Sequence, residues 1–288
     1  MSYNAVQVKP RLKTEDQRVA ELVVPERFRY LAPTETGLIR VGRDGDGGYV
    51  ITPESLKVTN ALVSLGLSTD WSFDTDFLKR RRGIWYRGVD RSSGFLVHLL
   101  AAIRSCTKFP VDLSSARKSL AVALRFLRLV PLIQVPRRRR FYRKWVRHIV
   151  IDEARDVSLV EVLRSMPVTA GVFLKMDIEG GEYQLLPEVV ALAEQNRDYF
   201  SGLCIEFHDI SRRESEFHQL VQRLQTEFSI VHVHVNNCAS VDGDFPTVLE
   251  ISFAKIEVTE NLKVRRLPKS NVDFPNNPSR PDFTLIFE

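Results

Sequence analysis

Residues 229–253, SIVHVHVNNCASVDGDFPTVLEISF, hold two apolar strand patterns, Ser229–Val235 and Thr247–Phe253. The link between them, Asn236–Pro246, is rich in turn-forming residues and too short to contain a crossover helix. Consecutive strands that are joined in this way pair antiparallel. This stretch therefore predicts a β-sheet that ends in an antiparallel hairpin.

Upstream of the hairpin, apolar strand patterns alternate with amphipathic helix patterns. The expected strands are 61–65, 83–89, 171–176 and 202–207, and the expected helices are 74–82, 159–165, 183–195 and 212–228. This alternation is typical of a parallel sheet with helices on both faces. Because the sheet ends in an antiparallel hairpin, we predict an α/β protein with the Rossmann-like methyltransferase fold rather than the dinucleotide-binding fold.

The first 58 residues form a predicted N-terminal extension of a domain that spans 59–288. Within this extension, residues 14–31 have the pattern of a short helix that is interrupted near Pro25. Residues 38–51 instead predict a short β-hairpin around a turn rich in Gly and Asp.

The basic residues are concentrated in a predicted helical insertion at about 92–148, with expected helices at 94–104, 114–129 and 137–147. The whole chain has 41 Lys+Arg and 36 Asp+Glu, a net charge of +5. Residues 101–148 hold 13 of the basic residues and one acid, so the rest of the chain carries a net charge of −7. This split excludes a uniformly basic nucleic-acid-binding surface and indicates one basic element on an acidic body.

Residues Arg137–Arg147, RRRRFYRKWVR, would place Phe141 and Trp145 on one side of a basic amphipathic helix. Such a helix favours peripheral contact with an anionic membrane or an acidic substrate. The structural alternative is a solvated face whose aromatic rings pack on the body. Aromatic residues among basic ones also suit single-stranded nucleic acid, which we rank last as a partner because the rest of the chain is acidic.

The cysteines and the N-terminus favour a cytoplasmic protein. Cys106, Cys204 and Cys238 are odd in number and form no C-x-x-C pair, which favours reduced thiols in a reducing compartment. The first residues, MSYNAVQVKPRLK, lack the apolar core of a signal peptide. The longest apolar stretch, 121–135, is interrupted by charges and is shorter than the roughly 20 residues of a membrane span. We expect a cytoplasmic protein, with peripheral membrane association as the alternative.

Ligands of open α/β sheets bind outside the carboxyl ends of the strands, so the residues that follow each strand form the candidate site. The first strand runs into SLGLSTD (64–70), where Gly66 permits a close backbone approach. No G-x-G-x-x-G or Walker sequence follows, which disfavours a bound pyrophosphate. The second strand ends at Asp90, where nucleoside-binding folds place an acid that accepts the ribose hydroxyls. Pairing with a neighbouring arginine is the structural alternative for Asp90.

Two later strands end in residues that can carry chemistry. Asp177 and Glu179 follow one strand, within LKMDIEGGE, and would suit a cationic sulfonium, a divalent metal or a substrate hydroxyl. Helix capping is the structural alternative for Glu179. Glu206 and His208 end the next strand, and the ordinary pKa of a histidine, about 6.5, suits proton transfer.

Seven segments follow one another between residues 41 and 283: VGRDGDGGYVI, SLGLSTDWSFD, YRGVD, FLKMDIEGGEYQLL, CIEFHDI, HVHVNNC and DFPNNPSRPDF. In this order they resemble the FkbM-type S-adenosylmethionine-dependent methyltransferases, in particular the methyltransferase-like branch with a G-D-G-G-Y element. The resemblance implies a Rossmann-like fold and S-adenosylmethionine as the methyl donor. It also implies O-methylation of a small-molecule or glycan acceptor, on a hydroxyl of a sugar, a glycolipid or a secondary metabolite.

The resemblance further implies roles for individual residues. Ser64, Gly66 and Asp70 would belong to the cofactor loop, Asp90 would hold the ribose, and Asp177 would contact the cofactor at the methyl-transfer centre. The loop departs from the family pattern, because G-L-S-T-D stands where standard methyltransferases have G-x-G-x-G.

Methyl transfer needs an acceptor oxygen at about 3–3.5 Å from the methyl carbon and a group that removes its proton. His208 is the expected base, with Asp177 as the alternative. A divalent metal held by Asp177, Glu179 and Glu206 would be another way to lower the pKa of the hydroxyl. A dinucleotide-dependent oxidoreductase and a non-catalytic membrane- or nucleic-acid-binding protein remain the alternatives to a methyltransferase.

Overall fold

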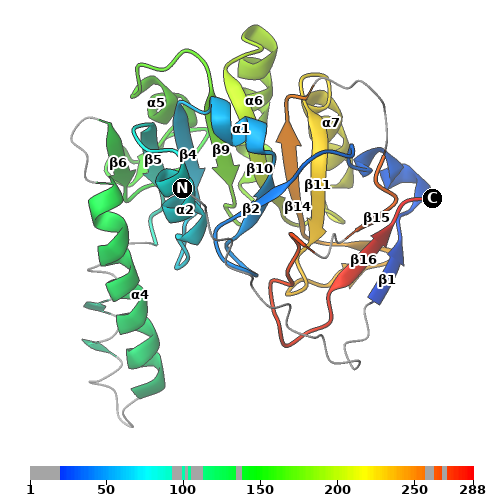
Figure 1. Ribbon diagram of the computed structural model, residues 1–288. Helices are drawn as coiled ribbons and strands as arrows, with labels where there is room; N and C mark the ends of the chain where they lie inside the picture. Colours follow the sequence, from blue (N-terminus) through cyan, green and yellow to red (C-terminus); the bar gives the residue numbers. More distant parts are fainter. Residues whose placement is uncertain are drawn as a thin grey trace, which may run out of the picture.

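The computed structural model describes residues 20–92, 99–100, 103–104, 113–133, 138–256, 263–267 and 271–288. A seven-stranded sheet forms its centre, with the strand order β11-β14-β10-β9-β4-β5-β6 (Figure 1). The strands of this sheet are β4 (Ala61–Leu65), β5 (Trp85–Val89), β6 (Arg139–Tyr142), β9 (Val172–Met176), β10 (Phe200–Phe207), β11 (Ser229–Val235) and β14 (Leu249–Ala254).

Neighbouring strands of the sheet are parallel except at β14, which pairs antiparallel with both β10 and β11. Numbered along the chain, the strands of the sheet lie in the order 6-7-5-4-1-2-3. This is the doubly wound order with a seventh, antiparallel strand inserted between the fifth and the sixth. The predicted Rossmann-like methyltransferase fold is therefore confirmed, and so is the antiparallel pairing of β11 with β14.

Helices cover both faces of the sheet, as the strand patterns predict. One face carries α5 (Leu159–Arg164), α6 (Glu182–Gln195) and α7 (Glu214–Leu224), and the other carries α1 (Pro53–Val58) and α2 (Ser72–Arg80) (Figure 1). Along β4, Ala61, Val63 and Leu65 belong to the core on the α6 face. The intervening Leu62 belongs to the core on the α2 face, so both sides of the strand need apolar residues.

The N-terminal region differs in part from its prediction. Ala20–Val23 form β1, which pairs in parallel with β16 (Phe283–Ile286), and Glu26–Leu31 form a 3₁₀ helix. The predicted helix over 14–31 is therefore wrong for Ala20–Val23, because pairing with a strand near the C-terminus determines their structure; residues 14–19 lie outside the described residues. β2 (Ile39–Val41) and β3 (Tyr49–Ile51) form the expected antiparallel hairpin. The domain boundary after residue 58 stays a prediction.

The predicted helix over Arg137–Arg147 is wrong for residues 138–147; Arg137 lies outside the described residues. Arg139–Tyr142 form β6, the edge strand beside β5, and Trp145–Val146 form β7, which pairs with β8 (Asp156–Val157). Phe141 packs against the core on the α2 face, whereas Tyr142 is buried in the core on the α6 face. Consecutive residues thus point to opposite sides of the sheet, which is the geometry of a strand and not of a helix.

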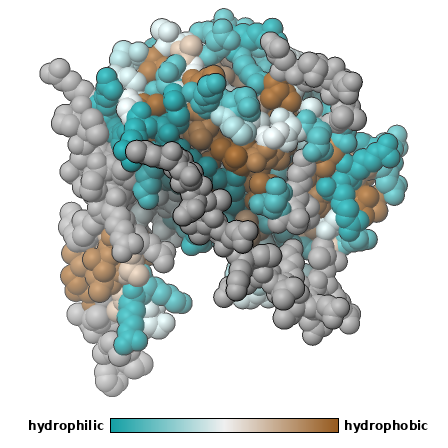
Figure 2. Space-filling view, viewed as in Figure 1, coloured by the Kyte–Doolittle hydropathy of each residue, from teal (hydrophilic) through white to brown (hydrophobic). Residues whose placement is uncertain are grey.

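The helix α4 (Leu113–Ile133) extends beyond the edge of the sheet and confirms the helix expected over 114–129 (Figure 1). Leu120 and Leu124 are exposed on it, and Figure 2 shows apolar atoms gathered at this end of the molecule. Most of the helix expected over 94–104 lies outside the described residues. None of the helices in the described ranges is both long and apolar enough to cross a membrane.

Candidate active site

The carboxyl ends of β5, β4, β9 and β10 lie next to one another in the sheet and form the candidate site. Among the described residues, the non-glycine positions with left-handed φ angles are Ser68 (45°), Glu179 (54°) and Asp209 (52°). Each of them follows the carboxyl end of one of these strands. Such conformations cost about 1–3 kcal/mol and concentrate at functional sites. The backbone therefore indicates the same edge of the sheet that the topology indicates.

Two cavities open at this edge. The first, of about 300 Å³, lies over the ends of β4, β5 and β9 and beside β7, and we call it the β5-side cavity. Its lining is predominantly apolar and includes Val89, Val146 and Ile178, with Asp90 in the wall. Such a cavity suits a nucleoside, because the base packs on apolar side chains and the sugar hydroxyls bond to the carboxylate.

The second cavity, of about 380 Å³, lies over the ends of β9 and β10 and beside β3, and we call it the β10-side cavity. Its lining is more polar and includes Glu206 and His208. Both cavities are lined by Ser68, Asp177 and Glu179. A group that passes from a ligand in one cavity to a ligand in the other would therefore cross at these three residues.

Asp90 joins the ends of β4 and β5. Its Oδ2 atom accepts hydrogen bonds from the backbone N–H groups of Leu67 and Ser68, at 2.8 and 2.6 Å. Its Oδ1 atom accepts a hydrogen bond from the Ser92 hydroxyl at 2.7 Å. The predicted ribose-binding residue thus lines the β5-side cavity and also holds the turn after β4 in place.

The other residues that were expected in the cofactor loop occupy different positions. Gly66 has a left-handed φ of 74°, and a Cβ there would overlap the carbonyl oxygen of Asp177, so the close approach comes from β9. Ser64 is fully buried within β4 and, in the described part of the chain, lines neither cavity. Asp70 lines the β10-side cavity and pairs with Arg43 at 2.9 Å.

Asp177 is held by two residues whose roles were not predicted. The Tyr49 hydroxyl donates a hydrogen bond to Oδ2 of Asp177 at 3.1 Å, and Lys175 Nζ lies 3.3 Å from the same oxygen. Lys175 also donates to the carbonyl oxygen of Gly66. Burial would lower the pKa of Lys175, but the charges of Asp177 and Asp74 outweigh burial and raise it, so the ammonium stays protonated. The sequence signal for Tyr49 was its place in the G-D-G-G-Y element.

His208 is bound to a buried carboxylate. Its Nδ1 atom lies 3.0 Å from Glu182, a fully buried residue in the first turn of α6. Its Nε2 atom lies 3.4 Å from Glu179 and 3.9 Å from Glu206. Burial alone would lower the pKa of His208, but the hydrogen bond to Glu182 and the charges of Glu182, Glu206 and Asp177 raise it to about 9. The imidazole therefore holds its proton more tightly than an ordinary histidine does; the role of His208 as the base stays a prediction.

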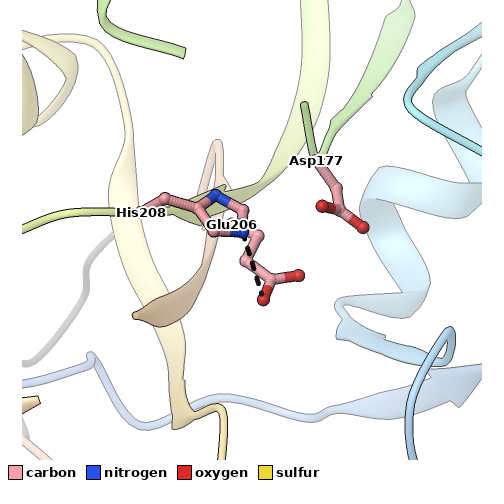
Figure 3. Close-up of side chains that lie close together, drawn as sticks. All are labelled: Asp177, Glu206 and His208. Carbon is pink, nitrogen blue, oxygen red and sulfur yellow. Dashed lines mark ion pairs between the residues drawn. The ribbon is translucent and has the colours of Figure 1, made fainter. Parts of the chain in front are cut away.

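Asp177, Glu206 and His208 can each offer one metal-ligand atom, and these atoms all lie within 4.8 Å of one another (Figure 3). The metal set predicted from the sequence had Glu179 in the place of His208; the side chain of Glu179 is 87% exposed. Asn236 donates a hydrogen bond to Oε1 of Glu206 at 2.7 Å. Burial, followed by the charges of nearby carboxylates, raises the pKa of Glu206 well above its ordinary value.

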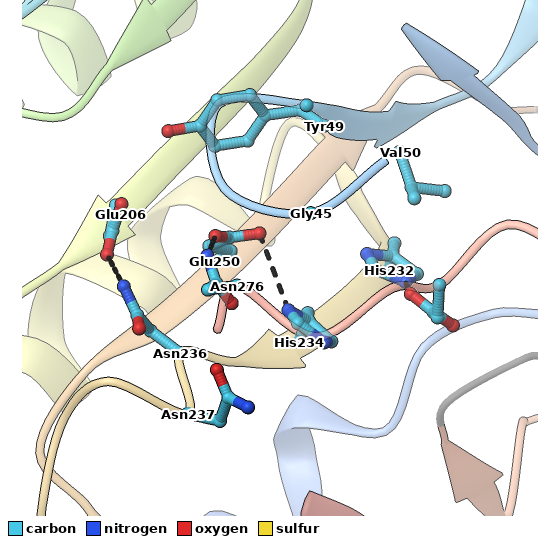
Figure 4. A network of polar contacts seen from close by, with 12 residues as sticks. Gly45, Tyr49, Val50, Glu206, His232, His234, Asn236, Asn237, Glu250 and Asn276 are labelled. Atoms are coloured by element: carbon cyan, nitrogen blue, oxygen red, sulfur yellow. Dashed lines mark hydrogen bonds and ion pairs between the residues drawn. The ribbon is translucent and has the colours of Figure 1, made fainter. Parts of the chain in front are cut away.

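A second polar network joins β11 and β14 to residues near the C-terminus (Figure 4). His232 Nε2 lies 2.7 Å from Asp273. His234 lies 3.6 Å from Glu250 of β14 and 3.5 Å from Asp282. These contacts attach the segment DFPNNPSRPDF to the sheet, which gives the segment a structural role.

No protein-family model matches the chain, and no curated protein matches it. The chain is similar to a solved structure of methyltransferase FkbM from Methylobacillus flagellatus KT, with 14% identity and a TM-score of 0.38 over 67% of this chain and 44% of that one. The chain thus aligns with less than half the length of that protein.

Two further solved structures are also methyltransferases by their names. Precorrin-6y C5,15-methyltransferase from Geobacter metallireducens GS-15 is 13% identical, with a TM-score of 0.34 over 70% of this chain and 86% of that one. The human methyltransferase 10 domain containing protein is 9% identical, with a TM-score of 0.34 over 69% of this chain and 73% of that one. The fold class of the chain follows from its own strand order.

Proposed function

We propose that the protein is an S-adenosylmethionine-dependent methyltransferase of the FkbM type that methylates a hydroxyl group. The observation that carries this proposal is the apolar β5-side cavity with Asp90 in its wall, at the carboxyl edge of a sheet with the order 6-7-5-4-1-2-3. Two segments of the resemblance, VGRDGDGGYVI and LKMDIEGGE, support the FkbM type, because Tyr49 of the first donates a hydrogen bond to Asp177 of the second.

The residues that line the β5-side cavity fit the proposed cofactor. S-adenosylmethionine supplies an electrophilic methyl group on a positively charged sulfonium. In the proposal, Val146 and Ile178 pack against the adenine, and Asp90 accepts hydrogen bonds from the ribose hydroxyls. Asp177 and Glu179 stand in the wall that the two cavities share, where their negative charge favours the sulfonium.

The acceptor would occupy the β10-side cavity. Carboxylates line this cavity, among them Asp46 and Asp70, so a neutral acceptor with several hydroxyls, such as a sugar, fits it better than an anion does. Asp177 lines both cavities, whereas His208 lines only the β10-side cavity and is bound to Glu182. In the absence of a bound cation, Asp177 would therefore orient the acceptor hydroxyl and accept its proton.

Calorimetric titration with S-adenosylmethionine tests the proposal. We expect the wild-type protein to bind S-adenosylmethionine and not NAD⁺. Asp90→Ala should weaken binding about tenfold or more, because a hydrogen bond to a charged group contributes about 1.5–3 kcal/mol. Asp90→Asn keeps the size of the side chain and one oxygen that can accept the hydrogen bonds from Leu67 and Ser68. It therefore tests the loss of the charge without the loss of these contacts.

Asp242→Ala is the matched control, because Asp242 is an exposed aspartate on β12 (Val241–Asp242) and lines neither cavity in the described part of the chain. It should bind S-adenosylmethionine as the wild type does. No binding by the wild type, or equal affinity in Asp90→Ala and Asp242→Ala, would overturn the proposal. A mass-spectrometric screen of sugars and glycans for the gain of one methyl group then identifies the acceptor.

A further inference from the structure

We propose that Asp177, Glu206 and His208 form a binding site for a divalent transition-metal ion in the wall of the β10-side cavity. The three side chains come from the carboxyl ends of two adjacent parallel strands, β9 and β10 (Figure 3). Their candidate ligand atoms lie within 4.8 Å of one another, close enough for one ion to contact all three after small side-chain movements. With bonds of about 2.0–2.2 Å, two ligand atoms of one ion lie at most about 4.4 Å apart, so movements of less than about 1 Å would complete the site.

The hydrogen bond of His208 gives its ring the orientation of a metal ligand. Nδ1 of His208 lies 3.0 Å from Oε1 of Glu182, and the same oxygen accepts hydrogen bonds from the backbone N–H groups of Ile178 and Gly180. Histidines that bind metals usually donate their second ring N–H to a carboxylate in this way, which fixes the ring and the tautomer. Because Nδ1 is bound to Glu182, Nε2 is the ring nitrogen that can bind a metal ion. His208 lines the β10-side cavity, and its Nε2 atom lies 3.9 Å from Glu206.

The burial of the Glu206 carboxylate makes a nearby cation favourable. Its side chain is 6% exposed, and Asn236 fixes the Oε1 atom with a neutral amide. In the pairing of β10 with β14, Glu206 stands directly opposite Glu250, which adds a second carboxylate. The buried ammonium of Lys175 is directed to Asp177 and to the carbonyl oxygen of Gly66. In the described contacts the cationic neighbour of Glu206 is His208, whose Nε2 lies 3.9 Å away, and a divalent ion between Glu206, His208 and Asp177 would take the place of the Nε2 proton and face both carboxylates.

One imidazole nitrogen and two carboxylates favour Mn²⁺, Fe²⁺ or Zn²⁺ over Ca²⁺ or Mg²⁺, which prefer ligand sets made of oxygen alone. Three protein ligands leave open positions, and the cavity of about 380 Å³ has room for an acceptor beside the ion. The role of the ion rests on the proposed function: it would polarise the acceptor hydroxyl and lower its pKa. His208 and Asp177 would then act as ligands, and the proton of the acidified hydroxyl would pass to water in the cavity.

Titration of the EDTA-treated full chain with Mn²⁺, followed by electron paramagnetic resonance, tests the site. We expect one bound Mn²⁺ per chain. Glu206→Gln and His208→Gln should each weaken binding at least about tenfold, and Glu182→Gln, which removes the partner of the ring, should weaken it about 10–100-fold. Glu216→Gln, a change of an exposed glutamate that pairs with Arg213 on the surface, is the control and should bind as the wild type does.

The bound ion can also be examined in the wild-type protein alone, which keeps the test valid if a variant fails to fold. Electron spin echo modulation from a ¹⁴N nucleus should appear in the Mn²⁺ complex, because His208 is the nitrogen ligand. Absence of bound Mn²⁺, absence of this modulation, or equal affinity in folded Glu206→Gln and Glu216→Gln would overturn the site.

The two experiments can contradict the metal site and the proposed function independently of each other. Mn²⁺ binding is measured without S-adenosylmethionine, and S-adenosylmethionine binding is measured after EDTA treatment. A chain that binds S-adenosylmethionine but not Mn²⁺ overturns the metal site and leaves the methyltransferase. A chain that binds Mn²⁺ with ¹⁴N modulation but not S-adenosylmethionine keeps the site and overturns the methyltransferase.

Discussion

At the scale of the residue, Gly66 connects the backbone of the first sheet strand to the site. Its φ of 74° is left-handed, and a Cβ would overlap the carbonyl oxygen of Asp177, which follows the neighbouring strand β9. We therefore expect Gly66→Ala to lower the free energy of unfolding by about 3 kcal/mol or more, since backbone strain and steric overlap add. Urea denaturation followed by circular dichroism measures this loss.

Gly37→Ala is the control for that substitution, because a Cβ at Gly37 meets no atom within 4 Å. It should leave the urea midpoint within the range of ordinary surface substitutions, about 0.5 kcal/mol. If Gly66→Ala proved as stable as Gly37→Ala, the close contact between the turn after β4 and Asp177 would be wrong.

The residues of the site differ in how far they can be predicted from the sequence. Asp90, Asp177 and His208 each follow an apolar strand pattern, so the rule for open α/β sheets places them at one edge. The contact of Lys175 with Asp177 and that of Glu182 with His208 depend on distances between elements, which no local pattern contains. For the same reason the sequence could not show that its carboxylate neighbours raise the pKa of His208.

At the scale of the element, the strands with apolar residues at consecutive positions could be predicted, and β6 could not. Arg139–Tyr142 contain two arginines, and their spacing with Trp145 imitates a helical repeat. These residues pair with the edge of β5, and Phe141 and Tyr142 pack on opposite faces of the sheet. These tertiary contacts determine that the segment is a strand. Pairing across about 50 residues of intervening chain is tertiary information that overrides a local pattern.

Because this basic segment contains β6 and β7 instead of the predicted helix, a membrane contact would not use the face of an amphipathic helix. Arg138 and Lys144 donate hydrogen bonds to backbone carbonyl groups, and Arg147 pairs with Asp156, so part of the basic charge serves the fold. Arg140 and Arg143 are exposed, and exposed apolar side chains follow them in the chain: Trp145, Ile149 and Ile151. A basic surface with such apolar side chains suits an anionic membrane.

We expect the protein to bind vesicles that contain phosphatidylserine, and the double variant Arg140→Glu/Arg143→Glu to bind them at least about tenfold more weakly. Each basic residue near an anionic surface contributes about 1 kcal/mol. Sedimentation with vesicles at several salt concentrations measures the affinity. Arg212→Glu/Arg223→Glu changes the net charge equally at two exposed positions near α7 and should bind as the wild type does. Equal binding by both double variants would contradict a contact through Arg140 and Arg143.

At the scale of the whole molecule, buried histidines attach the C-terminal segment, and through β16 also β1, to the sheet. The segment that holds Asp273 and Asp282 contacts His232 and His234 of β11, and β16 beyond it pairs with β1 near the N-terminus. The stability of the sheet edge and that of the termini are therefore linked through ionisable groups.

His234 makes this link depend on pH. Burial would lower its pKa, but hydrogen bonds to Asp282 and Glu250 outweigh burial and raise the pKa to about 10. The ordinary pKa of an unfolded histidine is about 6.5, so the folded state binds the proton more tightly. Its contribution to stability is complete below about pH 6.5 and is lost as the pH rises toward 10. The free energy of unfolding should therefore fall over this range, with a contribution from His234 of up to about 1.4 kcal/mol per pH unit.

Urea denaturation of the wild type and of His234→Gln at pH 6.5, 8 and 9.5 isolates this contribution. The variant lacks the imidazole with the raised pKa, so its free energy of unfolding should fall less steeply with pH than that of the wild type. The difference in free energy between the two proteins should therefore shrink as the pH rises. Gln222→Ala, a change at an exposed residue of α7 that does not titrate, is the control and should keep the wild-type slope. If His234→Gln kept that slope as well, the proton on His234 would not link the C-terminal segment to the sheet.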